Sequence, residues 1–332
     1  MSARSSFLSP RFDPEGPGAA LAVAVDGRPV QVECIGFADI AQQIPITPDT
    51  RFDLASVSKT FTAALLLRLA AAGRVDVNGP AADWLPALGR PASGRPITLR
   101  DLLAHTSGLP DYLADGMDTP PERTAVRSIL DELPRWGAAA RPGITHAYAN
   151  TNYVLLAQVI EAVTGTPFTE ACAKELFAPL GLAHTAVCPD PPAGTVAIGY
   201  VQDQYGVPRW DVSEPMPLET VGDGGVVSSL TDLLRWHEAL WSGEAVPEPW
   251  WTRMRTPSRL DSGEPIPYGL ALQVEQDAGG RTWVGHGGSW VCSTVLVGRY
   301  VEQRTTVLLL ANDPLAPVAR IAPRAAALLG NG

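Results

Sequence analysis

The sequence predicts a mixed α/β fold, in which strand patterns at both ends of the chain enclose a helix-rich middle. A short apolar run, an Asp26-Gly27 turn and the alternation after it predict a β-hairpin over residues 18–34. Strand patterns recur in the C-terminal third. They cover residues 268–276, 281–285, 290–297 and 305–310, and a helical pattern follows at 316–329. At 332 residues, the chain can form one large domain or two interlocked lobes.

The first strong helix pattern, residues 60–72, is almost wholly apolar and predicts a helix buried in the core. Ser56 and Lys59 stand at its start, three positions apart, so a helix places hydroxyl and amine on one side. Burial lowers the pKa of a lysine, and a neutral amine can accept a serine proton. The alternative is a Ser56 helix cap with Lys59 reaching solvent. Because the chain has only two lysines, a Ser-x-x-Lys spacing is rarely expected by chance.

The segment after this helix is rich in Pro and Gly up to residue 96, and Thr98 to Asp101 then form a capping box for a helix at 99–104. His105 and Ser107 follow two positions apart on a turn, which favours a hydrogen-bonded turn over a base and nucleophile pair. Residues 111–141, with a helical piece at 124–133, are interpreted as a lid or surface cover.

A second polar cluster precedes the predicted helix 152–163, which Gly165 and Pro167 end. Tyr148 and Asn150 lie on the loop that enters this helix. Taken alone, Asn150 is typical of a helix cap and Tyr148 of a packed aromatic residue. A further helix is expected at 168–176.

Two strands, 197–202 and 207–212, are predicted before the Gly-rich segment 222–229 and a helix at 230–241. The Gly-rich segment lacks the Gly-Lys-Ser/Thr ending of a phosphate loop, so it does not indicate a nucleotide site. Its glycines are instead expected to permit positive φ or a close backbone approach.

The third polar cluster is His286-Gly287-Gly288-Ser289, which the pattern places between two strands. Two glycines there allow a strand edge to present its N–H groups to a ligand at close range. The alternative is a plain β-turn with an exposed histidine.

The composition excludes several kinds of function. A net charge of −10 argues against nucleic acid or an anionic membrane as partner, and no apolar run approaches the roughly 18 residues of a membrane span. The five histidines and four cysteines show no metal-ligand spacing, so we expect no metal and no cofactor, and free cysteine thiols. The sequence also lacks the Gly-x-Ser-x-Gly motif that carries the nucleophile in α/β-hydrolases, which argues against that class of enzyme. Residues 1–18 lack a signal-peptide pattern, which predicts a cytoplasmic protein.

Taken in order, Ser56-x-x-Lys59, Tyr148-x-Asn150 and His286-x-Gly288 resemble the motifs of the penicillin-recognising serine hydrolases. The similarity is to the branch of class C β-lactamases, D-aminopeptidases and lactamase-like esterases, and it spans most of residues 52–312. It implies a β-lactamase-like two-lobe fold, with the active site in the cleft. Residues 1–74 and 205–332 would form an α/β lobe with an antiparallel sheet flanked by helices, and 75–204 a mostly helical inserted lobe.

The resemblance also implies a role for each motif. Ser56 would be the acylated nucleophile, Lys59 would share its proton, and Tyr148 would act as general base, its phenolate favoured by the lysine charge. Asn150 would bind Lys59 or a substrate carbonyl. The N–H groups of Ser56 and Ser289 would form the oxyanion hole.

One departure bears on the substrate. Many penicillin-binding relatives have Lys-Thr-Gly where this chain has His286-Gly287-Gly288, so the groups that would hold a substrate carboxylate are missing. This favours a small ester or amide over a lactam. A histidine with a near-neutral pKa would also make activity sensitive to pH between about 6 and 7.

The leading hypothesis is therefore a serine hydrolase that takes a small-molecule ester, amide or lactam. Alternatives are an acyltransferase that passes the acyl group to an amine or alcohol, a β-lactamase or D-amino-acid peptidase, and a non-catalytic sensor. Specificity is expected from residues 111–141 and from tryptophans such as Trp210, Trp250, Trp251 and Trp290. The sequence determines neither the acyl group nor the oligomeric state.

Overall fold

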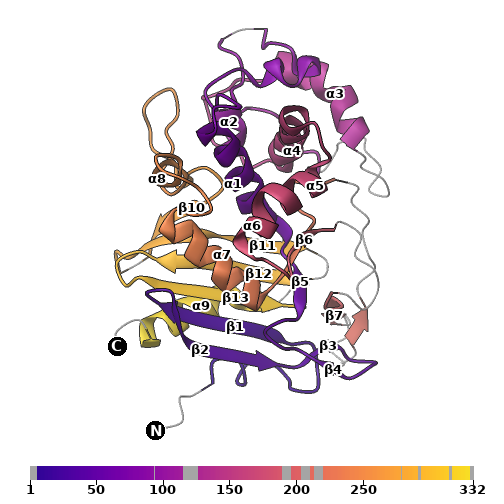
Figure 1. The fold of residues 1–332 in the computed structure, drawn as a ribbon, viewed down its shortest axis with the longest axis vertical. Coiled ribbons are helices and arrows are strands. Elements are labelled where there is room, and N and C mark those ends of the chain that lie inside the picture. Colours follow the sequence, from indigo (N-terminus) through magenta and orange to yellow (C-terminus); the bar gives the residue numbers. More distant parts are fainter. Residues whose placement is uncertain are drawn as a thin grey trace.

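The computed structural model describes residues 6–92, 94–114, 126–188, 196–202, 210–212, 220–277, 279–290, 293–313 and 316–329. Figure 1 shows a large sheet in one half of the molecule and a group of helices in the other. The division into an α/β lobe, residues 1–74 and 205–332, and a helical lobe, residues 75–204, stays a prediction.

The large sheet has six strands in the order β10-β11-β12-β13-β1-β2, and every neighbouring pair is antiparallel. Its strands are β1 (Ala19–Val25), β2 (Arg28–Ile35), β10 (Gln273–Gln276), β11 (Thr282–Trp290), β12 (Ser293–Tyr300) and β13 (Thr305–Ala311). The predicted hairpin is confirmed, with Asp26 and Gly27 both at positive φ in its turn. Because β13 pairs with β1 along its whole length, the two ends of the chain build one sheet.

Both faces of this sheet are covered, which explains why β1 and residues 307–311 of β13 are apolar throughout. Ala20 and Leu308 belong to the main core on the face of helix α7 (Leu230–Ser242). Leu21 and Leu309 belong to a second core on the face of helix α9 (Val318–Leu329). Since successive strand residues point to opposite faces, the continuous apolar pattern follows from this double cover.

The helical half surrounds α1 (Ser58–Ala71), which is buried along nearly all of its length as predicted. Other helices are α2 (Leu99–Leu103), α3 (Val126–Ala139), α4 (Asn150–Thr164), α5 (Phe168–Cys172), α6 (Ala178–Leu180) and α8 (Trp250–Met254). Short turns are η1 (Ala55–Val57), η2 (Ala81–Asp83), η3 (Pro86–Leu88) and the π-type η4 (Ala173–Phe177). The capping box is confirmed, because Thr98 and Asp101 exchange side-chain and backbone hydrogen bonds at the start of α2.

A small sheet, β5-β9-β6, connects the two halves. It contains β5 (Arg51–Asp53), β6 (Ala186–Val187) and β9 (Val226–Ser229), while β3 (Phe37–Asp39) pairs with β4 (Ile44–Pro45) and β7 (Tyr200–Gln202) with β8 (Trp210–Val212). Antiparallel pairing of β5 with β9 sets Phe52 opposite Ser228. The Gly-rich segment before β9 is thereby brought against the turn that carries Ser56.

Two strand predictions in the C-terminal third are wrong. Residues 281–285 and 290–297 are not separated by a turn at His286, because β11 runs without interruption from Thr282 to Trp290. Of the strand expected at 268–276, only Gln273–Gln276 is a strand. Of the strands predicted at 197–202 and 207–212, residues 200–202 and 210–212 are strands, and residues 203–209 lie outside the described residues.

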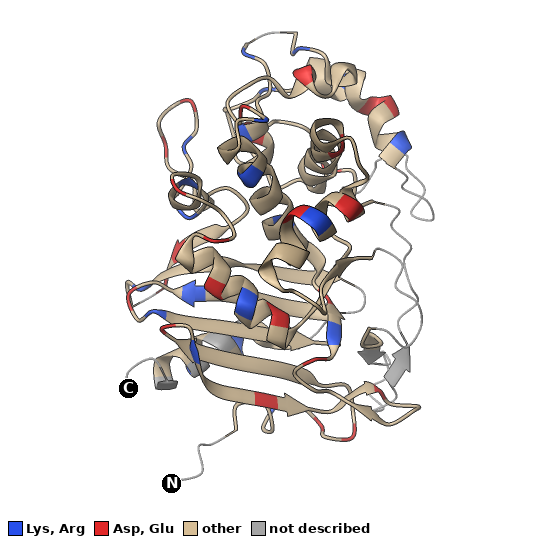
Figure 2. Ribbon diagram, in the orientation of Figure 1, with Lys and Arg blue, Asp and Glu red and all other residues tan. Residues whose placement is uncertain are grey.

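Charged residues of both signs are interspersed along the elements rather than separated by sign, as Figure 2 shows. Within the described part of the chain, no helix combines the length and apolarity needed to cross a membrane. Cys34, Cys172 and Cys188 are free thiols, as expected, and Cys292 lies outside the described residues.

Candidate active site

Ser56 lies in the single-turn helix η1, directly before α1. The preceding residue, Ala55, has φ of +45°, a left-handed conformation that costs a residue with a Cβ about 1–3 kcal/mol. The Ala55 N–H donates to Asp53 Oδ1 (2.8 Å), which helps to hold the turn. The strained turn leaves Ser56 half-buried while its neighbours Ala55 and Val57 are buried.

Lys59 is completely buried, and its Nζ is within hydrogen-bond distance of three oxygens. These are Ser56 Oγ at 3.0 Å, Asn150 Oδ1 at 2.8 Å and the main-chain O of Asp223 at 2.7 Å. Burial lowers the pKa of the amine to about 8, although the charges of Asp223 and Asp111 oppose the shift. A neutral amine can donate to two of these oxygens and accept the Ser56 proton with its lone pair. The geometry thus presents a base to the Ser56 hydroxyl.

Tyr148 lies beside the nucleophile and its base: Lys59 Nζ is 5.1 Å from the centre of the Tyr148 ring, and the Ser56 side chain is close enough to affect the pKa of the phenol. The residue is 41% exposed, whereas its hydroxyl is largely buried. Burial raises the pKa of this phenol; the Ser56 side chain opposes the shift, and the charges of Asp223 and Asp111 add to it. Burial therefore favours the neutral phenol, whereas the resemblance implied a phenolate favoured by lysine.

Asn150 begins α4 and is held by a residue that the sequence analysis did not single out, Asp111. The Asn150 backbone N–H donates to Asp111 Oδ1 (3.1 Å), and its Nδ2 donates to Asp111 Oδ2 (3.1 Å). Because Asp111 can only accept, these bonds direct Asn150 Oδ1 to Lys59. Lys59 and a substrate carbonyl were the two partners expected for Asn150, and the structure shows the bond to Lys59.

His105 and Ser107 shape the loop that carries Tyr148, as the interpretation of a hydrogen-bonded turn implied. His105 Nδ1 accepts from the Ala149 N–H (3.1 Å), and its ring stacks on that of Tyr148 with 4.2 Å between centroids. Ser107 Oγ donates to Asn152 Oδ1 (2.6 Å). Burial and the charge of Lys59 lower the pKa of His105 well below its usual value, so the ring is neutral.

His286 is buried inside β11, so the exposed-turn alternative is wrong, and the ring lacks the near-neutral pKa from which pH-sensitive activity was expected. Its Nδ1 donates to the carbonyl O of Gly287 (2.6 Å), which leaves Nε2 to accept from the Tyr268 hydroxyl (3.0 Å). Burial and the charge of Lys59 lower the pKa of His286 to about 4. The imidazole is neutral throughout the range from pH 6 to 7.

Strand β11 packs directly on the turn η1. A Cβ on Gly288 would lie 2.6 Å from Leu54 O and 3.1 Å from Ser56 N, so only glycine permits this approach. Pairing with β10 stops at Gly285, and from His286 to Trp290 the strand pairs with β12 alone. This arrangement brings exposed Ser289 near Ser56, and an oxyanion hole formed by their N–H groups stays a prediction.

Gly288→Ala is expected to lower kcat/KM about 100-fold, because the methyl group forces β11 away from η1 and displaces an oxyanion donor. Gly287→Ala is the matched control, since its Cβ would meet no atom closer than 3.7 Å. Steady-state kinetics of both variants on one ester would test this. Similar losses in the two would contradict the close-packing argument.

The pH dependence of kcat/KM should follow the loss of the proton from Lys59. With an uncharged ester, kcat/KM should rise about tenfold per pH unit up to about pH 8 and then level, because only the neutral amine accepts the Ser56 proton. No inflection is expected between pH 6 and 7, since His286 titrates near 4. An inflection in that interval would assign the essential base to another group.

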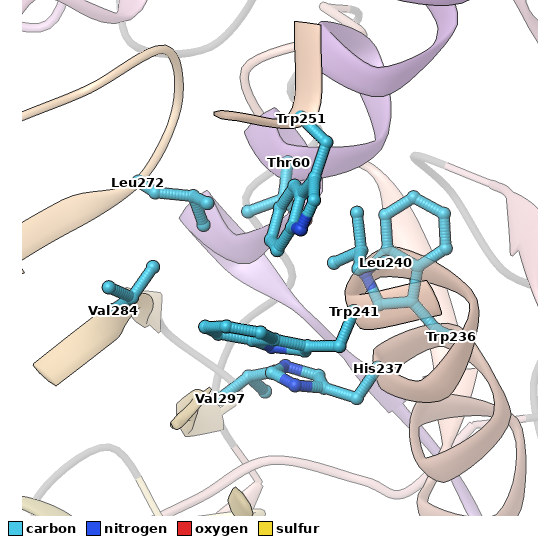
Figure 3. A pocket seen from close by; sticks show the side chains of 9 residues that line it. All are labelled: Thr60, Trp236, His237, Leu240, Trp241, Trp251, Leu272, Val284 and Val297. Atoms are coloured by element: carbon cyan, nitrogen blue, oxygen red, sulfur yellow. The ribbon is translucent and has the colours of Figure 1, made fainter. Parts of the chain in front are cut away.

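A small apolar cavity lies away from these groups. Its lining includes Trp236, His237, Trp241 and Trp251, which Figure 3 shows together with Thr60 of α1. Trp251 is buried and lines this internal cavity rather than the cleft. The side chain of Trp210 is not among those that the structure describes. Among the described residues, no group of three or more His, Cys, Asp or Glu side chains could hold a metal ion.

The chain is similar to known proteins along most of its length. The Beta-lactamase family profile matches residues 11–331. A D-aminopeptidase of Brucella ovis is 31% identical over 290 residues, which cover 84% of this chain and 53% of that protein. Penicillin-binding protein 4* of Bacillus subtilis is 31% identical over 293 residues, covering 83% of this chain and 64% of that protein. The chain thus spans between about half and two thirds of the length of these relatives.

Solved structures show the same fold. An octameric penicillin-binding protein homologue from Pyrococcus abyssi superposes with a TM-score of 0.80 at 29% identity, covering 96% of this chain and 74% of that chain. The D-amino acid amidase of Ochrobactrum anthropi SV3 superposes with a TM-score of 0.80 at 27% identity, covering 95% of each chain. The predicted β-lactamase-like fold is confirmed.

Proposed function

The chain belongs to the β-lactamase family of serine hydrolases, and from this premise we propose that it hydrolyses a small amide or ester through an acyl-enzyme on Ser56. The observation that carries the proposal is the 3.0 Å distance between Lys59 Nζ and Ser56 Oγ at a fully buried amine. An amine with a pKa of about 8 is neutral in about a tenth of molecules at pH 7, far more often than an ordinary lysine, so it can act as a general base.

In the proposed reaction, Ser56 Oγ bonds to the substrate carbonyl carbon while its proton passes to Lys59. The bond to the leaving nitrogen or oxygen then breaks, and that atom takes the proton. Tyr148, whose phenol lies beside Ser56 and Lys59, is placed to carry it. Water next adds to the acyl carbon and gives up a proton by the same route. The acid is released, and the Ser56 hydroxyl is restored.

The charges near Ser56 favour a substrate without a carboxylate. Where many penicillin-binding relatives have a lysine, His286 is buried and neutral. Asp111 instead supplies a half-buried negative charge, bonded to Asn150. Together with the relatives named D-aminopeptidase and D-amino acid amidase, this supports an amide that carries a free amino group as the first substrate to test.

The test is a series of alanine and phenylalanine p-nitroanilides, in D and L forms, with the amino group free, acetylated or succinylated. We expect kcat/KM to fall from free amine to acetyl to succinyl, with Asp111→Asn narrowing the difference between the first two. A preference for the succinylated compounds would contradict the charge argument. Added hydroxylamine would reveal acyl transfer, if the hydroxamate replaced the acid as product.

A further inference from the structure

The Gly-rich turn before β9, to which the sequence analysis assigned no chemistry, contacts the buried amine. Its Asp223 accepts a hydrogen bond from Lys59 Nζ at the main-chain O (2.7 Å). Gly222 holds the turn against α4, because a Cβ there would lie 2.5 Å from Tyr153 O, and its φ is +98°. The position of the Asp223 backbone is therefore set by packing and not by the amine alone.

The carboxyl of Asp223 is buried in the same place. Its Oδ2 accepts from the Tyr112 hydroxyl (2.7 Å), which also meets Thr220 Oγ1 at 3.0 Å. Its Oδ1 is buried and finds no hydrogen-bond partner among the described residues. A buried carboxyl with one oxygen unbonded is costly, and such groups call for an explanation beyond packing.

We propose that Asp223 is a positioning residue for the base: its carbonyl fixes the Lys59 amine, and its carboxylate, held by Tyr112, stabilises the ammonium that forms when Lys59 takes the Ser56 proton. The proposal deepens the proposed function and rests on it only where Lys59 is called the base. It assigns to the turn at residues 222–225 the task of keeping a fully buried lysine basic enough to take the Ser56 proton.

The surroundings of Lys59 single out this carboxyl. The groups that face or influence the amine come from six positions: Asp223, Asp111, His105, His286, Tyr148 and Tyr153. Both imidazoles are neutral, because burial and Lys59 itself lower their pKa values. The negative charge near the amine comes from the carboxyls of Asp223 and Asp111. Asp223 is the buried one, and its charge acts on the amine through a medium of low dielectric. Burial raises the pKa of Asp223, while Lys59 and Tyr112 oppose that rise.

The consequence is a balance between two effects on the lysine. Burial alone favours the uncharged amine, and a base that is too weak cannot hold the proton that leaves Ser56. The Asp223 carboxylate favours the ammonium that forms during acylation. Removing its charge should therefore lower the pKa of Lys59 further and move the acid limb of the kcat/KM profile to lower pH.

The chain offers a direct readout, because Lys59 and Lys174 are its only lysines. Lysine labelled with ¹³C at Cε gives two signals, and exposed Lys174 serves as the internal reference. Titration by NMR should place Lys59 near pH 8 in the wild type and about one unit lower in Asp223→Asn. Asp232→Asn is the matched control, since this buried carboxylate bonds His184 and Thr185 instead, and the wild-type value is expected.

An unchanged Lys59 titration in Asp223→Asn would overturn the proposal, and so would an equal shift in Asp232→Asn. If Asp223→Asn does not fold, Asp223→Ser provides a second uncharged variant, for which a shift in the same direction is required. Because no substrate is used, the titration reports on Asp223 even if Ser56 proves not to be the nucleophile.

Discussion

Ser56→Ala is expected to lower kcat/KM on any ester or amide substrate by about four orders of magnitude or more, because Ser56 carries the hydroxyl that the buried Lys59 amine contacts at 3.0 Å. The fold should be retained, since Ser56 is half-buried and Lys59 keeps its bonds to Asn150 and Asp223. Kinetics with p-nitrophenyl acetate, beside circular dichroism of each protein, would measure both effects.

Ser242→Ala is the control for that substitution, because the Ser242 hydroxyl donates to Ala239 O (3.2 Å) near the end of α7, within its own helix. Wild-type rates are expected for it. If Ser56→Ala kept a rate within tenfold of the wild type, an acyl-enzyme on Ser56 would be contradicted.

Lys59→Met is expected to lower kcat/KM by about 10²–10⁴-fold, the usual contribution of a general base. Methionine is of similar length and can occupy the buried site, but it cannot accept the Ser56 proton. The loss should persist at pH 9, where the wild-type amine is mostly neutral. Asn150 Oδ1 and Asp223 O would lose a donor, so stability should fall by about 1–3 kcal/mol for each.

Lys174→Met separates the loss of this amine from the loss of any lysine. Lys174 is exposed in η4, so its substitution should change neither rate nor unfolding temperature. Should Lys59→Met keep more than a tenth of the wild-type rate at pH 9, the base must be sought elsewhere, with Tyr148 the next residue to test.

Local patterns were sufficient to predict the scaffold of the site. The unbroken apolar stretch predicted buried α1, and the short spacing from Ser56 to Lys59 predicted their contact, now seen at 3.0 Å. The capping box before α2 and the helix after Tyr148 also depend only on neighbours in the chain. The resemblance of three ordered motifs predicted the fold that the comparisons confirm.

What the sequence could not provide is contact between distant segments. Asp111 and Asp223 reach Asn150 and Lys59 across 39 and 164 positions, and no local pattern marks either carboxylate. Burial and, after it, these same carboxylates raise the pKa of the Tyr148 phenol. An isolated His-Gly-Gly-Ser is typical of a turn, and only the packing of Gly288 on Leu54 O explains glycine inside a strand.

The central claim is that a buried, neutral Lys59 makes Ser56 the nucleophile. Its most direct test is intact mass followed by peptide mapping, after brief incubation of wild type and Lys59→Met with an activated p-nitrophenyl ester at pH 9. We predict one acyl group on Ser56 in the wild type, formed about 10²–10⁴ times faster than in Lys59→Met. An acyl group on another residue, or equal rates of acylation in the two proteins, would contradict it.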